Sequence, residues 1–280
     1  MRDAYRRSLV TGIESSVSGN VIESLAYTYD ALNRPTARNA DAFGYNDRSE
    51  VTNAVVAGIL ERHDYDEIGN SLWATCGNAG FYYTANSCNQ YYNVYYTDDL
   101  NCPSDQVASA YDLDGNMTQF GGWTYAYDAA NRLKTASTNG VVVLTNFYDV
   151  KSRRVKKVTA ESTTTFFYDD WNLIEECIAY TNGTTSTIHY YWGKDLSGTL
   201  QGAGGVGGLL YFTVDGAIYI PFYDNNGNIT RYLDSTGETV ATYTYDAFGN
   251  TISQSGPLTD FFRHRFSTKY FDIETGLYYY

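Results

Sequence analysis

The sequence TYTYDAFGNTI, residues 242–252, contains two strand-like halves and the turn that joins them. Before the turn, threonine alternates with tyrosine, which is the period-two pattern of a strand with aromatic rings on one face. The Asp246 carboxylate can accept a backbone N–H two residues further on, and Gly249 can adopt positive φ at low cost. We therefore predict a strand, an Asp-led turn closed by a left-handed residue, and a second strand.

The Tyr-Asp dipeptide recurs along the whole chain. It occurs eight times, and several neighbouring copies lie about 20 residues apart, the length of one hairpin with its connection. In six copies the third residue after Asp is Gly or Asn, and both residue types tolerate positive φ. The predicted structural turn residues of these six copies are Tyr29, Asp30, Asn33, Tyr65, Asp66, Gly69, Tyr111, Asp112, Gly115, Tyr127, Asp128, Asn131, Tyr223, Asp224, Gly227, Tyr245, Asp246 and Gly249.

The remaining two copies depart from the pattern: Ser152 replaces the turn glycine after Tyr148, and the turn after Tyr168 is one residue shorter. We read both as local variations of one repeat. The repeat predicts an all-β protein built of antiparallel β-hairpins in one curved or spiralling sheet. Residues 48–60 could hold one or two helical turns, and residues 66–110 are expected to hold insertions or degenerate copies.

The composition agrees with a sheet that has one packed and one solvent-exposed face. The chain has 29 Tyr beside 13 Phe and 4 Trp, and tyrosine combines an apolar ring with a polar hydroxyl. The net charge of −13 argues against a nucleic-acid partner, whose phosphates require clustered Lys and Arg. Residues 1–10 do not resemble a signal peptide, and every apolar run is too short to span a membrane.

The sequence predicts no metal site and no cofactor site. Cys76, Cys88, Cys102 and Cys177 have spacings that fit no zinc pattern, and a disulfide and free thiols are equally compatible with them. The histidines, which are His63, His189 and His264, share no ligand spacing either. Residues 202–207 match GxGxxG, but a strand-like segment follows instead of the required helix, so we read them as a flexible glycine connection.

Charged clusters have plain structural interpretations. We expect Arg263-His264-Arg265 and residues 153–157 (RRVKK) to lie on solvated strands or turns. Adjacent carboxylates such as Glu175-Glu176 point to opposite faces of a strand, so they cannot act together on one bond. We read such pairs as surface charge or turn chemistry and predict no catalytic residue.

Paired tyrosines leave two interpretations open. They could form platforms that stack on sugars, but cross-strand pairs are the commoner use of neighbouring aromatic residues in a sheet. The pairs are Tyr82-Tyr83, Tyr91-Tyr92, Tyr95-Tyr96 and Tyr190-Tyr191.

The repeats resemble the Rhs/YD-repeat family, which includes bacterial rearrangement-hotspot proteins, wall-associated toxins and insecticidal toxin-complex subunits. The resemblance covers nearly the whole chain. Residues 222–228 (FYDNNGN), 245–250 (YDAFGN), 266–270 (FSTKY) and 274–280 (ETGLYYY) are similar to the start of the Rhs-associated core. The resemblance implies a YD-repeat region over residues 1–200 and the start of the core over residues 201–280, continuous with the same sheet.

The resemblance also implies a function. In this family a long sheet spirals into a hollow shell around a toxic C-terminal polypeptide, which an aspartyl autoprotease releases. The autoprotease motifs lie beyond the point matching Tyr280, and Asp272-Ile273 stands where many members have Asp-Pro, so no catalytic residue is carried over. We expect a non-enzymatic shell segment of a secreted or cell-surface polymorphic-toxin-type protein.

The expected partner is the rest of the same or a longer polypeptide, including its toxin cargo. Two alternatives remain: a repeat module that binds cell-wall carbohydrate, and a self-cleaving core that needs residues beyond Tyr280. Because both ends fall inside repeat motifs, we expect the chain to be a fragment of a larger protein.

Overall fold

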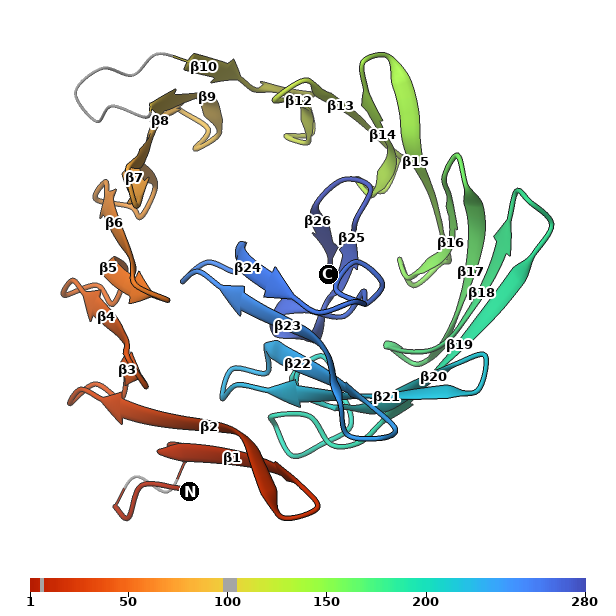
Figure 1. The fold of residues 1–280 in the computed structure, drawn as a ribbon. Helices are drawn as coiled ribbons and strands as arrows, with labels where there is room; N and C mark the ends of the chain where they lie inside the picture. The colour runs from red at the N-terminus through yellow and green to blue at the C-terminus, as the bar shows by residue number, and fades with distance from the viewer. Residues whose placement is uncertain (6–7, 98–104) are drawn as a thin grey trace. The chain divides into compact units, whose positions relative to one another are not determined.

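The computed structural model describes residues 1–5, 8–97 and 105–280. In these ranges the chain is almost entirely β-structure, with strands β1 to β26 and one short 3-10 helix, η1 (Phe266–Thr268) (Figure 1). The all-β prediction is therefore confirmed. The chain forms two compact units: unit 1 contains residues 1–122 and the loop 246–250, and unit 2 contains residues 123–245 and 251–280.

Unit 1 is a series of antiparallel hairpins. Strands β1 to β10 are neighbours in chain order, and β11 pairs with β12. The strands are β1 (Gly12–Val17), β2 (Asn20–Tyr29), β3 (Pro35–Arg38), β4 (Asp41–Tyr45), β5 (Val51–Val56), β6 (Ile59–Tyr65), β7 (Ser71–Cys76), β8 (Ala79–Ala85), β9 (Tyr91–Thr97), β10 (Asp105–Ala108), β11 (Ala110–Tyr111) and β12 (Met117–Phe120).

Unit 2 continues the same architecture. Strands β13 to β24 are again neighbours in chain order, and β25 pairs with β26. The strands are β13 (Trp123–Tyr127), β14 (Leu133–Thr138), β15 (Val141–Tyr148), β16 (Arg154–Val158), β17 (Ser162–Asp169), β18 (Asn172–Tyr180), β19 (Thr185–Trp192), β20 (Leu209–Val214), β21 (Ala217–Tyr223), β22 (Ile229–Asp234), β23 (Thr239–Tyr245), β24 (Thr251–Ser255), β25 (Tyr270–Asp272) and β26 (Leu277–Tyr279).

A β-bulge precedes most of the Tyr-Asp turns. The register shifts between Thr28 and Tyr29, between Asp64 and Tyr65, and between Thr244 and Tyr245. A bulge bends its strand and increases the local twist. Because the bulge recurs once per repeat, each hairpin adds a bend of the same kind, which accounts for the curvature of the strands within each unit.

The helical turns predicted for residues 48–60 are wrong, because this segment forms β5 and the start of β6. Ala57 and Gly58 have φ values of 51° and 79°, so they form a tight turn that an α-helix cannot contain. Residues 66–110 contain further hairpins built from β7 to β10, so this segment holds degenerate copies of the repeat.

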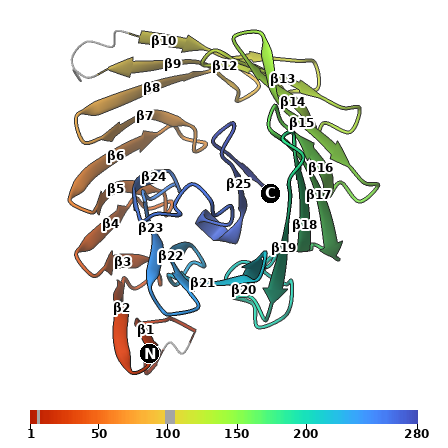
Figure 2. The same ribbon diagram turned by 45° about the vertical axis from the view of Figure 1, so that its right-hand side comes forward.

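The main hydrophobic core belongs to unit 2. Strands β17 to β23 curve around the C-terminal segment, which lies on their concave side (Figures 1 and 2). The Tyr232 and Phe262 rings pack at a centroid distance of 4.1 Å with their planes tilted by 30°, and both are almost fully buried. Burial of such large rings contributes roughly 2–3 kcal/mol each, so the C-terminal segment acts as the packed interior of this unit.

Candidate functional site

The Tyr-Asp turns share one geometry. In each of the six predicted copies the tyrosine is the last residue of a strand, and the aspartate follows it. The Asp66 carboxylate accepts the backbone N–H groups of Ile68 and Asn70 at 3.0 and 2.8 Å. The Asp66 N–H also donates to the Asn70 carbonyl, and the Gly69 N–H donates back to Asp66. Four hydrogen bonds thus close a five-residue turn.

The third residue after the aspartate has positive φ in all six turns. The values are 66° for Asn33, 93° for Gly69, 87° for Gly115, 59° for Asn131, 75° for Gly227 and 95° for Gly249. The aspartates make the same pair of contacts throughout: Asp30, Asp112, Asp128, Asp224 and Asp246 each accept the N–H groups two and four residues on. That these turn residues stabilise the protein remains a prediction.

The last residue of the turn was missed by sequence reasoning. Its side chain donates a second contact to the aspartate, from Asn70 Nδ2 at 2.7 Å to Asp66 and from Arg132 Nε at 2.8 Å to Asp128. The hydrogen bond from Arg132 lowers the pKa of Asp128 to about 2. The recurrence of Asn or Arg at this position was the signal that could have revealed the contact.

Turns headed by asparagine were also missed. Asn46 accepts the N–H groups of Arg48 and Glu50 at 3.0 Å each, and Ser49 takes the left-handed position with φ of 66°. An equivalent turn begins at Asn86. Because an Asn side-chain carbonyl accepts N–H groups as a carboxylate does, the turn survives without the Tyr-Asp signature.

A tyrosine hydroxyl connects consecutive repeats. The Tyr65 hydroxyl donates to the Val51 carbonyl at 2.8 Å, and Val51 is the first residue after the preceding turn. The other copies of this bond are Tyr29 to Val10, Tyr45 to Pro35, Tyr111 to Tyr91, Tyr148 to Leu133, Tyr168 to Arg154, Tyr223 to Leu209 and Tyr245 to Ile229. This recurring bond explains why the position is tyrosine, since phenylalanine could pack there but could not donate a hydrogen bond.

Arginines at the ends of turns strengthen these connections. Arg132 lies over the Tyr148 ring at 4.8 Å and donates to the Asp149 carbonyl at 2.9 Å, in the next turn of the series. Arg34 lies over Tyr45 at 4.7 Å in the same way. A cation over a ring at such an exposed site contributes about 0.5–1 kcal/mol. A turn that ends in arginine is therefore tied to the next by both a hydroxyl and a guanidinium.

The cluster at residues 153–157 is only partly solvated, so this prediction was wrong. Arg154 is 1% exposed and Lys157 is 3% exposed. Arg154 pairs with Asp272 at 2.5 Å, and Lys157 pairs with Asp272 at 3.2 Å and with Glu274 at 3.1 Å. Burial opposes ionisation of Asp272, but the two cations outweigh it and lower its pKa. We call these four residues the ion-pair clamp; they join β16 to the C-terminal hairpin.

Glu176 is a second buried charge that the sequence did not reveal. It is 1% exposed, whereas its neighbour Glu175 lies on the other face of β18. Its carboxylate accepts the Tyr190 hydroxyl at 2.6 Å and the Tyr270 hydroxyl at 3.0 Å. Burial raises the pKa of Glu176. The interpretation as surface charge is wrong for this residue, because the C-terminal segment covers it.

Arg263-His264-Arg265 was also predicted to be solvated, and this too is wrong. Arg265 is 3% exposed and donates to the carbonyls of Phe262 and Thr259. His264 is 5% exposed and makes edge-on ring contacts, with Tyr190 at 4.8 Å and Trp192 at 5.7 Å. Burial lowers the pKa of His264 to about 3, so the imidazole is neutral. The aromatic side chains around it come from strands distant in the sequence.

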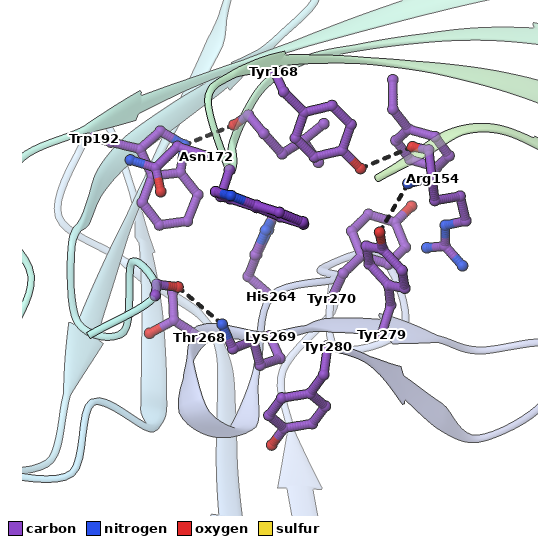
Figure 3. A pocket seen from close by; sticks show the side chains of 14 residues that line it. Arg154, Tyr168, Asn172, Trp192, His264, Thr268, Lys269, Tyr270, Tyr279 and Tyr280 are labelled. Carbon is purple, nitrogen blue, oxygen red and sulfur yellow. Dashed lines mark hydrogen bonds between the residues drawn. The ribbon is translucent and has the colours of Figure 1, made fainter. Parts of the chain in front are cut away.

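These elements line a partly open cavity of about 180 Å³ between the concave face of the strands and the C-terminal segment (Figure 3). Aromatic side chains form most of its wall, including Tyr168, Trp192 and Tyr270. The polar groups of the wall include those of Asn172, His264 and Lys269. The cavity lies beside Arg154 of the clamp, so the two features share one wall.

The glycine-rich segment at residues 202–207 joins β19 to β20. The N–H groups of Ala203 and Gly205 donate to the Asp195 carboxylate at 2.7 and 3.1 Å. A carboxylate of the chain itself therefore occupies the place that a phosphate would take in a nucleotide-binding loop.

The paired tyrosines make cross-strand contacts. Tyr191 stacks on Tyr211 of the neighbouring strand at 4.3 Å, and Tyr83 contacts Tyr91 at 5.2 Å. His63 lies 3.6 Å from Glu61, and His189 lies 3.1 Å from Glu175. Within the described residues no group of three His, Cys, Asp or Glu side chains could hold a metal ion.

Of the cysteines, Cys76, Cys88 and Cys177 are free, and Cys102 lies outside the described residues. None of the helices in the described ranges has the length and apolar character needed to cross a bilayer.

A family model of the Teneurin YD-shell matches residues 16–278. The chain belongs to the Teneurin YD-shell family. Among curated relatives, the tRNA3(Ser)-specific nuclease WapA of Bacillus spizizenii and the tRNA nuclease WapA of Bacillus subtilis strain 168 are each 31% identical over 227 residues. The match covers 79% of this YD-shell chain and 9% of either relative, so the chain spans about a tenth of their length.

Solved structures show the same YD-shell fold. The Tc holotoxin pore of Photorhabdus luminescens with a TccC3 mutation superposes with a TM-score of 0.50 at 12% identity, covering 96% of this chain and 18% of that chain. A TcdB2–TccC3 complex gives a TM-score of 0.50 at 12% identity, covering 95% of this chain and 18% of that one. The resemblance to the Rhs/YD-repeat family is confirmed by the family match and by this fold.

Proposed function

We propose that this chain is a wall segment of a YD-shell that encloses or delivers a polypeptide effector belonging to the same larger protein. The observation that carries the proposal is the position of the C-terminal segment. In unit 2 the hairpin β25–β26 lies against the concave face of the strands, held there by Arg154–Asp272 and by Tyr270–Glu176 (Figure 2). A polypeptide attached after Tyr280 would begin on the inner side of this curve.

The repeat supplies the mechanical part of this function. A single hairpin is marginally stable in water, whereas hairpins added side by side pair their edges and share aromatic contacts. The tyrosine hydroxyls connect neighbouring turns, with an added arginine contact where a turn ends in arginine, so the sheet can extend without a deep core at every repeat. We assign a structural role to this segment, and the nuclease activity named for the WapA relatives to parts outside the matched 9%.

The proposal also covers where the parent protein acts and how this chain divides into two regions. The parent protein would act outside the cell or at its surface, as the toxin-type relatives suggest. Residues 201–280 would be the start of the core region, continuous with the repeats of residues 1–200. The continuity of β19 with β20 in one antiparallel series supports this continuous arrangement.

Protease protection tests the enclosure. The same unstructured reporter peptide, with one protease site, is fused after Tyr280 in one protein and before Met1 in another, with the site placed about 5, 15 or 30 residues from the junction. We expect the C-terminal reporter to be cut at least about tenfold more slowly at the shortest spacing, with protection falling as the spacing grows. Equal cleavage at both ends, in folded protein, would contradict the proposal.

A further inference from the structure

The cavity of unit 2 has the size of one six-membered ring. Its volume is about 180 Å³, and an apolar protein cavity of about 150 Å³ is known to hold a benzene molecule. Phe166, Tyr168, Leu173, Trp192 and Tyr270 supply apolar surface on several sides. A flat apolar ring in the cavity would therefore pack against aromatic and aliphatic side chains.

His264 gives the cavity a polar group that lacks a partner. Its ring points into the space between Trp192 and Tyr270, and the residue is 5% exposed (Figure 3). No hydrogen bond joins its ring nitrogens to another residue in the described part of the chain. The imidazole is neutral, so it presents one donor and one acceptor. This donor and this acceptor are therefore available to a molecule that occupies the cavity.

The charges of the wall select against cations. Lys269 donates to the Gly204 carbonyl at 2.9 Å and has further N–H groups to offer. The side chains that line the cavity include no carboxylate. The Lys269 ammonium group, whose charge Asp195 offsets in part, would still repel a cationic ligand, whereas a neutral or anionic oxygen would find donors on Lys269 and His264.

The number of polar groups also selects against sugars. A pyranose ring carries about five oxygen atoms, and each one buried without a partner would cost free energy of about 1–3 kcal/mol. The wall also carries the hydroxyls of Tyr168, Thr268, Tyr270 and Tyr279, but each of these already donates within the chain. Few groups are therefore left for the oxygen atoms of a sugar. An aromatic ring with a single oxygen substituent matches both the apolar walls and the few polar groups.

We propose that this cavity binds a six-membered aromatic ring carrying one oxygen substituent, with His264 hydrogen-bonded to that oxygen. The phenol ring of tyrosine has this chemistry, and so do small free phenols. The proposal does not depend on encapsulation, because binding can be measured on the isolated chain. Trp171 and Trp192 line the cavity, so tryptophan fluorescence should report its occupancy.

Titration of the full chain with p-cresol and with toluene tests the proposal by calorimetry and fluorescence. We expect saturable one-to-one binding of p-cresol and about tenfold weaker binding of toluene, which lacks the hydroxyl. In His264→Phe the ratio of the p-cresol affinity to the toluene affinity should fall to about one. In Trp171→Ala, at a half-exposed position on the turn after β17, both probes should bind about tenfold more weakly. Trp123→Phe, away from the cavity, is the matched control.

Further titrations distinguish a tyrosine side chain from a small phenol as the natural ligand, and some of their results would contradict the proposal. A pentapeptide with a central tyrosine flanked by glycines should bind as p-cresol does if the natural ligand is a polypeptide side chain, and not at all if it is a small phenol. N-acetylglucosamine binding more tightly than p-cresol would overturn the proposal, and so would an unchanged preference in folded His264→Phe. If His264→Phe does not fold, unchanged p-cresol affinity in Trp171→Ala would overturn it instead.

Discussion

Unit 1 and unit 2 are built from the same turns but are stabilised differently. Both contain Asp-led or Asn-led turns with a left-handed residue, and both connect successive turns through tyrosine hydroxyls. Among the described residues, however, unit 1 contributes only Tyr27, Ala54, Val56 and Val94 to the fully buried hydrophobic side chains. The clustered core lies in unit 2, around its C-terminal segment.

This difference separates two levels of the fold. The turn and its connections are local and can be repeated without a thick interior, which unit 1 shows. A dense core requires a segment that packs back against the strands, and in unit 2 the C-terminal segment does so. The two units therefore should respond differently to substitutions that are chemically equivalent.

The largest expected loss of stability comes from breaking the ion-pair clamp, which belongs to unit 2. Arg154→Ala leaves Asp272 buried with one cation fewer, and we expect it to lower the free energy of unfolding of unit 2 by about 3–5 kcal/mol. Urea denaturation followed by tryptophan fluorescence measures the change. Arg153→Ala, one residue earlier on the more exposed turn, should cost about 1 kcal/mol or less. Equal losses would show that the clamp does not stabilise unit 2.

The second prediction compares the same substitution, glycine to alanine, at equivalent turn positions of the two units. Gly227→Ala would place a Cβ 2.5 Å from Val206 and 3.0 Å from the Gly207 nitrogen, whereas a Cβ at Gly69 meets only the Glu50 carboxylate, at 3.1 Å. Both positions have positive φ. We expect about 3–4 kcal/mol of destabilisation for Gly227→Ala and about 1–2 kcal/mol for Gly69→Ala, measured by thermal or urea unfolding. A larger loss at Gly69 would reverse the assignment of the tighter packing to unit 2.

Removal of one hydroxyl tests the connection between repeats. Tyr245→Phe deletes a buried donor to the Ile229 carbonyl, and Tyr65→Phe deletes a half-buried donor to Val51. Because a buried carbonyl left without a partner costs more, we expect losses of about 1–2 kcal/mol and about 0.5–1 kcal/mol respectively. Unfolding free energies of the two variants measure the difference. Stability unchanged in both would mean that the hydroxyls are not structural.

Acidification should produce the smallest effect, and it should be shared by both units. The pKa of Asp128 is lowered to about 2 by Arg132, and that of Asp66 is lowered by Asn70. A lowered folded-state pKa means that the stabilisation is present above the unfolded pKa, near 4, and is lost as the pH falls through about 2. Urea midpoints measured from pH 5 to pH 2 should fall. In Asp128→Asn the fall should be smaller, and an identical pH profile would contradict the assignment.

The sequence predicts the local level of this structure well. The φ constraint at Gly249 and the carboxylate contact of Asp246 are set within five residues, so the turn could be read directly. The asparagine-headed turn at Asn46 follows the same physics, but it lacks the Tyr-Asp signature and was missed. The segment at residues 48–60 was misread because a tight turn at Ala57 interrupts a run of apolar residues.

The long-range level could not be read from the sequence. Arg154 resembles a surface residue beside Arg153, and only its contact with Asp272, 118 positions away, explains its burial. The same holds for Glu176 and His264, which are covered by segments distant along the chain. A single sequence contains no local signal for such pairs, because strand periodicity predicts which face a residue occupies but not what will cover that face.

The separation between Arg154 and Asp272 also has a consequence for biosynthesis. At about 5–20 residues per second, a ribosome needs on the order of 10 s to add the 118 residues between the two partners. During that interval the inner face of β16 to β19 carries two cations and a glutamate that have not yet met the C-terminal hairpin. Unit 2 therefore cannot complete its core before β25 and β26 have been synthesised, and a chaperone that shields this face until they emerge should raise the yield of folded protein.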